Sequence, residues 1–201
     1  MGAGPRRTTL VPLALAALAA SISCGDVVRQ GRAPTFLVID RLQGASGVNP
    51  NQLGSTLASD VVTKGTIFED PGSAQVRILL KDPGNPGAPA SPSSINSVTI
   101  NRYRVTYRRS DGRNTPGVDV PYAFDGATTV TVTNLATPVA FTLVRAQAKL
   151  EAPLRALVGA GGRILISTIA DVTFYGRDQA GNEVTQTGSI SVNFSDWADP
   201  E

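Results

Sequence analysis

The sequence predicts a single all-β domain, an antiparallel β-sandwich of about seven to nine strands. Three observations favour this fold. Short runs in which apolar and polar residues alternate recur from residue 36 to residue 194, as in strands with one buried face. Val, Ile and Thr dominate these runs, and such β-branched side chains fit a pleated, half-buried surface. Clusters of Gly, Pro, Asn and Asp, which form tight turns, separate the runs.

The first half of the domain contains five expected strands. Short apolar runs predict strands at residues 36–39, 57–63 and 66–68. A clearer strand follows, where Val76, Ile78 and Leu80 share one phase. The next runs from Val98 to Tyr107, and its apolar phase switches between Ile100 and Tyr103. One extra residue must be accommodated there, so we expect a β-bulge at Asn101 or Arg102, or a strand that passes from one sheet to the other.

The second half contains four further apolar phases, each of which predicts a strand. These are Val130 and Val132; Val139, Phe141 and Leu143; Ile164, Ile166, Ala170, Val172 and Phe174; and Ile190, Val192 and Phe194. One short helix is expected at residues 152–158, where Pro153 fits the first turn and Gly159 can end the helix.

Turn chemistry predicts how these strands are connected. Tight turns are expected at residues 70–72, 110–112, 115–117, 125–126 and 181–182, which offer Gly, Pro, Asp or Asn at the required positions. Residues 82–94 contain four prolines and two glycines and few large apolar side chains. We expect them to form a long exposed loop.

The first 23 residues have the composition of an export signal. Arg6 and Arg7 precede an apolar stretch from residue 10 to residue 22, which is too short to span the roughly 30 Å of bilayer hydrocarbon. The only cysteine, Cys24, follows directly. We therefore expect a cleaved signal peptide over residues 1–23, a polar tether over residues 24–34 and the β-sandwich domain over residues 35–201.

The residues around Cys24 resemble the lipobox of bacterial lipoproteins. Ser21, Ile22 and Ser23 precede the cysteine and Gly25 follows it. The resemblance implies that Cys24 is acylated, becomes the new N-terminus and anchors the protein in the membrane of the cell envelope. Because Gly25 is not the aspartate that retains lipoproteins in the inner membrane, the resemblance further implies the outer membrane. Ser21 and Ser23 also suit an ordinary signal peptidase, and that alternative stays open.

The charge balance gives no sign of nucleic-acid binding. The chain has 18 basic and 16 acidic residues and no histidine, and loss of Arg6 and Arg7 with the signal peptide would leave 16 of each. One local cluster of arginines stands out, which is either a solvated strand face or a contact for an anionic partner such as lipopolysaccharide or phospholipid headgroups. Its members are Arg102, Arg104, Arg108, Arg109 and Arg113.

The residue types needed for most enzyme chemistry are missing. Without histidine the chain lacks the commonest general base and metal ligand, and its single cysteine leaves no set of zinc ligands. A carboxylate pair is the remaining catalytic option, with Asp171, Asp178 and Glu183 as the nearest candidates. We expect Asp171 to face solvent and the other two to flank a turn, so we predict a protein that is not an enzyme.

Two binding sites remain open. We expect no cofactor. Calcium is the one option left open, with Asp178, Asn182 and Glu183 as ligands, but an Asp and an Asn in a glycine turn hydrogen-bond their own backbone, and we favour that interpretation. Glycan or lipid binding would need exposed aromatic side chains. The aromatic residues that have no clear place in the core are Tyr122, Tyr175 and Trp197, and Trp197 can equally pack against one end of the sandwich.

Residues 172–194 resemble the last hairpin of bacterial immunoglobulin-like and fibronectin-type-III-like domains, in which an Asp-x-x-Gly-Asn turn joins the final two strands. Residues 103–107 are similar to a middle strand of the fibronectin-type-III fold. The resemblance implies a sandwich that serves adhesion, assembly or scaffolding. We therefore expect a non-enzymatic cell-envelope lipoprotein, in the periplasm or at the surface, which binds an envelope protein. A glycan- or lipid-binding module is the first alternative, and a carboxylate-dependent hydrolase is the least favoured.

Overall fold

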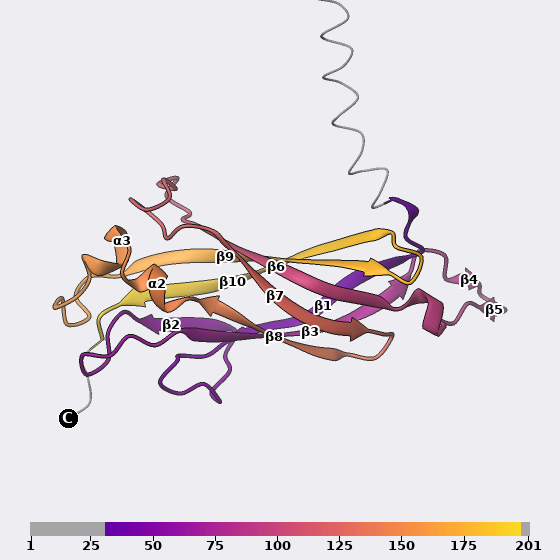
Figure 1. Ribbon diagram of the computed structural model, residues 1–201, viewed down its shortest axis with the longest axis horizontal. Coiled ribbons are helices and arrows are strands. Elements are labelled where there is room, and N and C mark those ends of the chain that lie inside the picture. Colours follow the sequence, from indigo (N-terminus) through magenta and orange to yellow (C-terminus); the bar gives the residue numbers. More distant parts are fainter. Residues whose placement is uncertain (1–30, 198–201) are drawn as a thin grey trace, which may run out of the picture.

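Two twisted sheets pack face to face in the computed structural model, which describes residues 31–197 (Figure 1). The smaller sheet has the order β1-β3-β8, with β1 at Thr35–Gly44, β3 at Asp70–Leu80 and β8 at Thr137–Val144. The larger sheet has the order β2-β10-β9-β6-β7. Its strands are β2 (Thr56–Asp60), β6 (Val98–Arg108), β7 (Phe124–Val132), β9 (Ile166–Asp178) and β10 (Glu183–Ser195). The predicted all-β sandwich is confirmed.

Neighbouring strands are antiparallel with one exception. β2 runs parallel to β10, with Thr56 opposite Ser191 and Asp60 opposite Ser195. The chain leaves the smaller sheet at the end of β1 and joins the larger sheet as β2, so its first two strands lie on opposite layers. This crossing brings the N-terminal part of the chain against the last strand.

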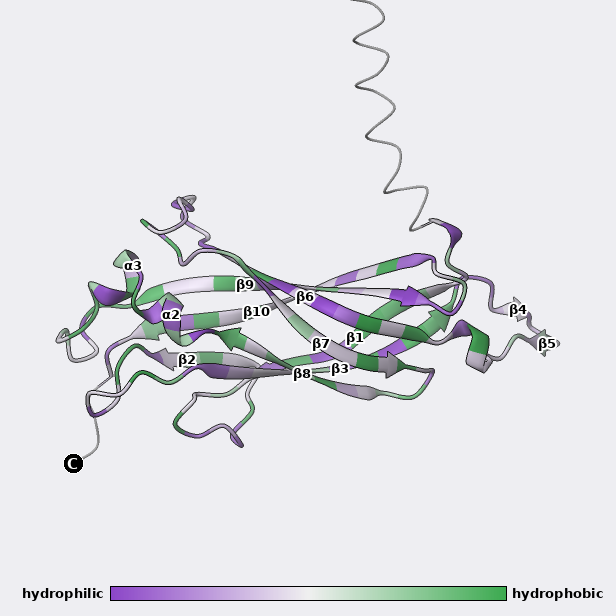
Figure 2. Ribbon diagram, in the orientation of Figure 1, coloured by the Kyte–Doolittle hydropathy of each residue, from purple (hydrophilic) through white to green (hydrophobic). Residues whose placement is uncertain are grey.

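The inner faces of the sheets form one apolar core. On β6 the buried side chains are Val98, Ile100, Tyr103, Val105 and Tyr107. Aromatic rings span the two layers, because Phe141 of β8 lies with its ring centroid 5.5 Å from those of both Tyr103 and Phe174. Figure 2 shows the alternation of apolar and polar residues along the strands that produces this core. Burial of one such large side chain stabilises the fold by roughly 1.5–3 kcal/mol.

The predicted bulge in β6 is confirmed. Its register shifts between Ile100 and Arg102 against both neighbours, β7 and β9. The extra residue returns Tyr103 to the inner face, so Ile100 and Tyr103 are both buried despite their odd spacing. The strand stays in one sheet, which excludes the alternative of a strand that changes sheets.

Two predicted turns are wrong because they lie inside strands. Residues 70–72 begin β3, and residues 125–126 belong to β7. In both places the glycine makes room for an aromatic ring: a Cβ at Gly72 would lie 2.4 Å from the ring of Phe141, and one at Gly126 would lie 2.1 Å from that of Tyr103. These glycines are therefore required by packing against a ring and not by a turn.

The predicted strand at residues 66–68 is also wrong. β2 ends at Asp60, and residue 66 makes only an isolated bridge to Thr63. Lys64 and Gly65 have φ values of 47° and 74°, so they close a tight turn between the two bridged residues. Ile164 is exposed, because β9 begins only at Ile166.

The other loops follow the sequence more closely. Gly112, Gly117 and Gly181 all have positive φ, as the predicted turns require. The predicted helix at residues 152–158 is α3, which spans only Ala152–Arg155, and a second short helix that was not predicted, α2, precedes it at Ala146–Lys149. The exposed loop at residues 82–94 contains a small hairpin, β4 (Gly84–Asn85) and β5 (Ala88–Pro89), and a 3₁₀ turn, η1 (Ser94–Asn96), follows it.

Strand directions define two ends of the sandwich. The tether end contains residues 31–34, 81–97, 133–136 and 179–182, and the helical end contains residues 45–55, 61–69, 109–123, 145–165 and 196–197. In Figure 1 the tether end, with β4 and β5, lies on the right, and the helical end, with α2 and α3, lies on the left. The 13-residue strand β9 connects the two ends and is about 40 Å long. Among residues 31–197 no helix is long and apolar enough to cross a membrane.

A buried ion pair organises the helical end. Lys149 Nζ of α2 lies 3.0 Å from Asp70 Oδ2 of β3, and both side chains are almost fully buried. The hydroxyl of Ser59 in β2 donates a hydrogen bond of 2.6 Å to the same carboxylate oxygen, and the backbone N–H of Gly47 donates one of 2.8 Å to the other. Burial raises the pKa of Asp70 above its ordinary value, although Lys149 and these two hydrogen bonds partly offset the effect.

We expect Lys149→Met to lower the free energy of unfolding by about 3–5 kcal/mol at neutral pH, because it leaves a buried carboxylate without its cation. Without Lys149 the folded state binds the Asp70 proton more tightly than the unfolded chain does. The difference in the free energy of unfolding between the wild type and Lys149→Met is therefore largest at neutral pH, and it becomes smaller as the pH falls toward about 4. Urea denaturation over this pH range measures it. Arg155→Met removes an exposed cation from the neighbouring helix α3 and serves as the control; equal losses in the two variants would contradict the prediction.

Candidate functional site

The three aromatic residues singled out from the sequence do not form one binding platform. Tyr175 lies on the outer face of the larger sheet, whereas Tyr122 and Trp197 lie at the helical end. Tyr122 packs over Gly117 and is 52% exposed. Trp197 lies beside Gly162, and its backbone N–H donates to Asp60 Oδ1 over 3.1 Å. The residues are therefore candidates for separate contacts.

Tyr175 lines a shallow polar hollow of about 350 Å³ next to the β6 bulge. The guanidinium of Arg102 lies 4.0 Å above the centroid of its ring and covers the face on which a sugar would stack. Arg177 and Glu183, at the rim, form an ion pair of 3.3 Å. The remaining lining residues are Asn101, Gly176 and Thr185. The hollow thus offers paired charges and hydrogen-bonding groups, but no free aromatic face.

Asp178 uses its carboxylate to close the β9–β10 turn. The side chain is buried and accepts hydrogen bonds from the backbone N–H groups of Ala180 and Asn182, at 2.9 and 2.8 Å. Asn182 also directs its side-chain Nδ2 to the same carboxylate at 2.8 Å, while Glu183 turns to Arg177. Of the three proposed calcium ligands, Asp178 and Asn182 therefore bond to each other. Residues 31–197 contain no cluster of three or more acidic, His or Cys side chains able to hold a metal ion.

The candidate carboxylates do not face one another. Asp171 and Asp178 are seven residues apart on β9, so they point to opposite faces of the sheet. Asp171 lies on the outer face. Its carboxylate accepts a hydrogen bond of 2.7 Å from Arg108 Nε and a short one from the hydroxyl of Ser189. Partial burial alone would raise the pKa of Asp171, but these hydrogen bonds outweigh it and lower the pKa below its ordinary value. A carboxyl group with a lowered pKa stays ionised at neutral pH, so Asp171 has no proton to donate as a general acid would.

Every arginine of the cluster has a carboxylate partner. Arg102 and Arg104 share Asp125, at 3.4 and 2.7 Å, and Arg108 pairs with Asp171. Arg109 pairs with Asp111, and Arg113 with Asp119. The cluster therefore sets four carboxylates against five arginines, and this pairing favours the solvated strand face over an anion-binding surface.

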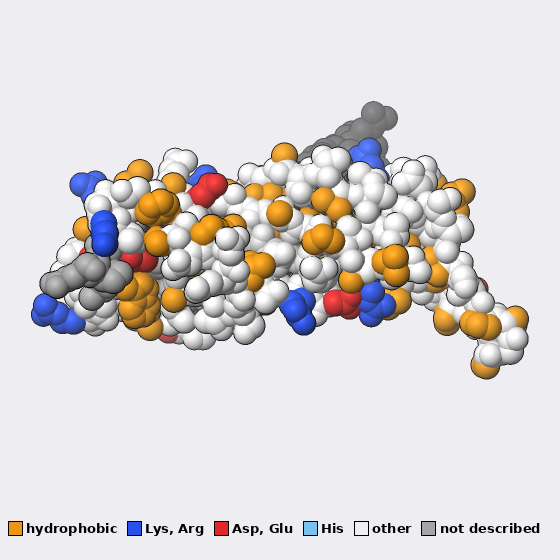
Figure 3. All heavy atoms as spheres, turned by 90° about the horizontal axis from the view of Figure 1, so that it is seen from below, with side chains coloured by type: hydrophobic (Ala, Val, Ile, Leu, Met, Phe, Trp, Pro, Cys, Tyr) orange, Lys and Arg blue, Asp and Glu red, His pale blue; other side chains and the backbone are white. Residues whose placement is uncertain are grey.

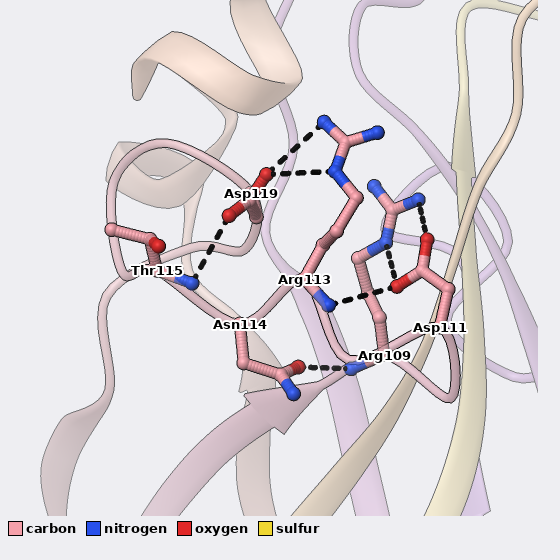
Figure 4. Close-up of polar contacts among 6 residues, drawn as sticks. All are labelled: Arg109, Asp111, Arg113, Asn114, Thr115 and Asp119. Carbon is pink, nitrogen blue, oxygen red and sulfur yellow. Dashed lines mark hydrogen bonds and ion pairs between the residues drawn. The ribbon is translucent and has the colours of Figure 1, made fainter.

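Two of these pairs order the loop between β6 and β7 (Figure 4). The Asn114 side chain closes it by accepting the Arg109 N–H over 2.6 Å, and Asp119 accepts the Thr115 N–H over 3.2 Å. Burial would raise the pKa of Asp119, but hydrogen bonds from Thr115 and Arg113 lower it below its ordinary value. The loop projects from the helical end, and Val118 within it is exposed.

The helical end also gathers exposed apolar side chains that the sequence analysis did not single out as a group. Ten large ones lie there: Val48, Leu53, Phe68, Val118, Tyr122, Leu150, Val158, Ile164, Leu165 and Trp197. The exposed Arg155 and Arg163 come from the same segments. Alternation along strands gave no signal for this surface, because its residues come from loops and short helices that only the fold brings to one end.

Comparison with protein families, curated proteins and solved structures found no match for this chain. The resemblances to lipoproteins and to immunoglobulin-like domains therefore stay predictions. Residues 1–30, which include Cys24 and the predicted signal peptide, and residues 198–201 lie outside the described part of the chain.

We expect Asp178→Ala to lower the free energy of unfolding by about 1–3 kcal/mol, because it removes the acceptor of two part-buried N–H groups of the turn and of the Asn182 side chain. The melting temperature of the wild type should be the same in calcium chloride and in EDTA, since the Asn182 amide already occupies the carboxylate. Thermal denaturation of both proteins in both buffers measures this. A rise in wild-type melting temperature with calcium, lost in Asp178→Ala, would instead favour a metal site.

Proposed function

We propose that this protein is a non-enzymatic lipoprotein of the bacterial cell envelope that serves as a structural or protein-interaction module. In this proposal acylated Cys24 anchors the protein in the outer membrane, as the resemblance to a lipobox implies. The observation that carries the proposal is that the two ends of the sandwich differ. The chain enters the sandwich at the tether end, and the β6–β7 loop and a group of exposed apolar side chains lie at the helical end.

Chain geometry links the anchor to this division. Seven residue steps separate Cys24 from Gly31, a reach of at most about 25 Å. The sandwich extends about 40 Å beyond that point, the length of β9. An anchored molecule would therefore hold its tether end near the bilayer and present the helical end to other envelope components.

The helical end has the character of a protein-binding surface. It combines exposed apolar groups, among them Trp197 and Tyr122, with arginines, and such residues are enriched where proteins bind one another. The ion pairs and hydrogen bonds of the β6–β7 loop favour its folded conformation, and a loop ordered before association has a lower entropic cost of binding.

The strand order supports the resemblance to immunoglobulin-like domains. The sequence β10-β9-β6-β7 in the larger sheet corresponds to the G-F-C-C′ order of variable-type immunoglobulin sheets. The glycan-binding alternative has less support, because Arg102 covers Tyr175 and the other two aromatics lie far along the sandwich. A hydrolase has the least, because Asp171 and Asp178 point to opposite faces.

We expect the exported protein to carry the mass of the acyl groups on Cys24 and to partition into detergent. The Cys24→Ala variant cannot be acylated, so it should lack this mass and stay in the aqueous phase. Intact-mass measurement and detergent partition of both proteins test the anchor. An unacylated wild-type chain cut near residue 23 would contradict it and indicate a secreted domain.

We expect photo-cross-linking groups placed at Val118 or Val158 in living cells to give the same discrete protein adduct. Both positions are exposed at the helical end, at 66% and 51%. The matched control is Thr129, which is exposed on the outer face of β7. Electrophoresis and mass spectrometry identify the adducts. Equal adducts from all three positions, or none from the helical end, would count against a protein partner at this end.

A further inference from the structure

The tether end lacks charge over two long stretches of the chain. Residues 83–101 and 126–144 contain no Asp, Glu, Lys or Arg. The first stretch forms the β4–β5 hairpin and η1, and the second contains the β7–β8 turn. Figure 3 shows the hairpin as a protrusion whose tip carries only apolar and uncharged atoms. The loops of the helical end, by contrast, carry the ion pairs of Figure 4.

Large apolar side chains project from these uncharged segments. Leu135, in the β7–β8 turn, is 71% exposed, and Ile95 in η1 is 66% exposed. Phe36 and Leu79 are cross-strand partners on the outer face of the smaller sheet near the same end, and both are exposed. Apolar groups of this kind gain by entering the boundary between headgroups and acyl chains, and the absence of charge avoids the cost of desolvating ions there.

Charged side chains lie at the base of this end: Asp82, which accepts the Gly84 N–H at 2.9 Å, and two cations. Lys81 Nζ lies 5.1 Å from the centroid of the Phe36 ring, and Arg32 is exposed where the described chain begins. In this arrangement amphipathic side chains keep a charged head at the level of the headgroups while their stems cover apolar surface. The position of Gly31 at this end, at most about 25 Å of chain from Cys24, brings the same surface to the bilayer.

We propose that the tether end rests on the bilayer to which Cys24 is attached, with Leu135, Ile95 and the β4–β5 hairpin in the interface. This inference rests on the lipid anchor of the proposed function. The docking adds a defined orientation to the lipid attachment, because it fixes the long axis of the sandwich relative to the membrane. The helical end then points away from the surface.

Tryptophan quenching by brominated lipids tests the contact. The mature chain, residues 24–201, is coupled through the Cys24 thiol to a maleimide lipid in phosphatidylethanolamine–phosphatidylglycerol vesicles. The reporter protein is Leu135→Trp combined with Trp197→Phe, and the wild type, whose only tryptophan lies at the helical end, is the matched control. We expect brominated lipid to lower reporter emission about two-fold or more, as for an indole buried roughly 5–10 Å into the boundary, and to leave the wild type unchanged.

A second pair of variants tests the apolar contact itself. Ile95 and Val118 are both 66% exposed but lie at opposite ends. In the reporter background Ile95→Asp should reduce the quenching, because it places a charge in the interface, whereas Val118→Asp should leave it unchanged.

The outcomes separate this inference from the proposed function. Because the maleimide supplies the attachment, the vesicle result does not depend on natural acylation, which the intact mass reports separately. An unquenched reporter on coupled vesicles overturns the docking but does not affect the lipid anchor. This is also the result expected if the natural partner of the tether end is a protein and not a bilayer. Equal quenching of reporter and wild type overturns a fixed orientation. Quenching of the reporter alone supports the membrane contact of this end. An unacylated exported chain would then overturn the anchor, and with it the attached arrangement, but not the contact.

Discussion

The buried carboxylate of Asp70 is the constraint on which the helical end depends. It connects four segments that are distant in sequence: β3, which carries it, Ser59 of β2, Gly47 of the loop between β1 and β2, and Lys149 of α2. A carboxylate taken out of water must have every oxygen satisfied, so these partners are fixed in position as a group. Short helices that would be unstable alone are thereby held against the end of the sandwich.

The strands divide the molecule into two ends, and this constraint holds one of them together. The strands provide a rigid core between two ends of different chemistry. One end has ion-paired loops and exposed aromatic groups around a fixed scaffold. The other has uncharged loops with projecting Leu135 and Ile95, at the place where the chain comes from Cys24. Both ends would be used by a protein that is attached to a membrane through Cys24, docks on that membrane with its tether end and binds a partner with its helical end.

The sequence predicted the strands because burial of one face leaves a period of two, and it even located the β6 bulge from the switch between Ile100 and Tyr103. It failed where local turn chemistry competed with packing. Residues 70–72 and 125–126 have turn composition, but Asp70 is a buried ion-pair partner and Gly126 makes room for Tyr103. The partner of Asp70 lies 79 positions away, on a helix that the sequence did not predict, and no local pattern indicates it. The apolar surface of the helical end was missed for the same reason.

Hydrogen–deuterium exchange of the acylated protein on vesicles, compared with the Cys24→Ala protein in solution, tests the central claim most directly. The account predicts that membrane attachment slows exchange in residues 84–96 and 133–136 and leaves residues 109–120 unchanged, since only the tether end meets the bilayer. Slower exchange at the helical end, or no change at either end once acylation is established, would contradict it.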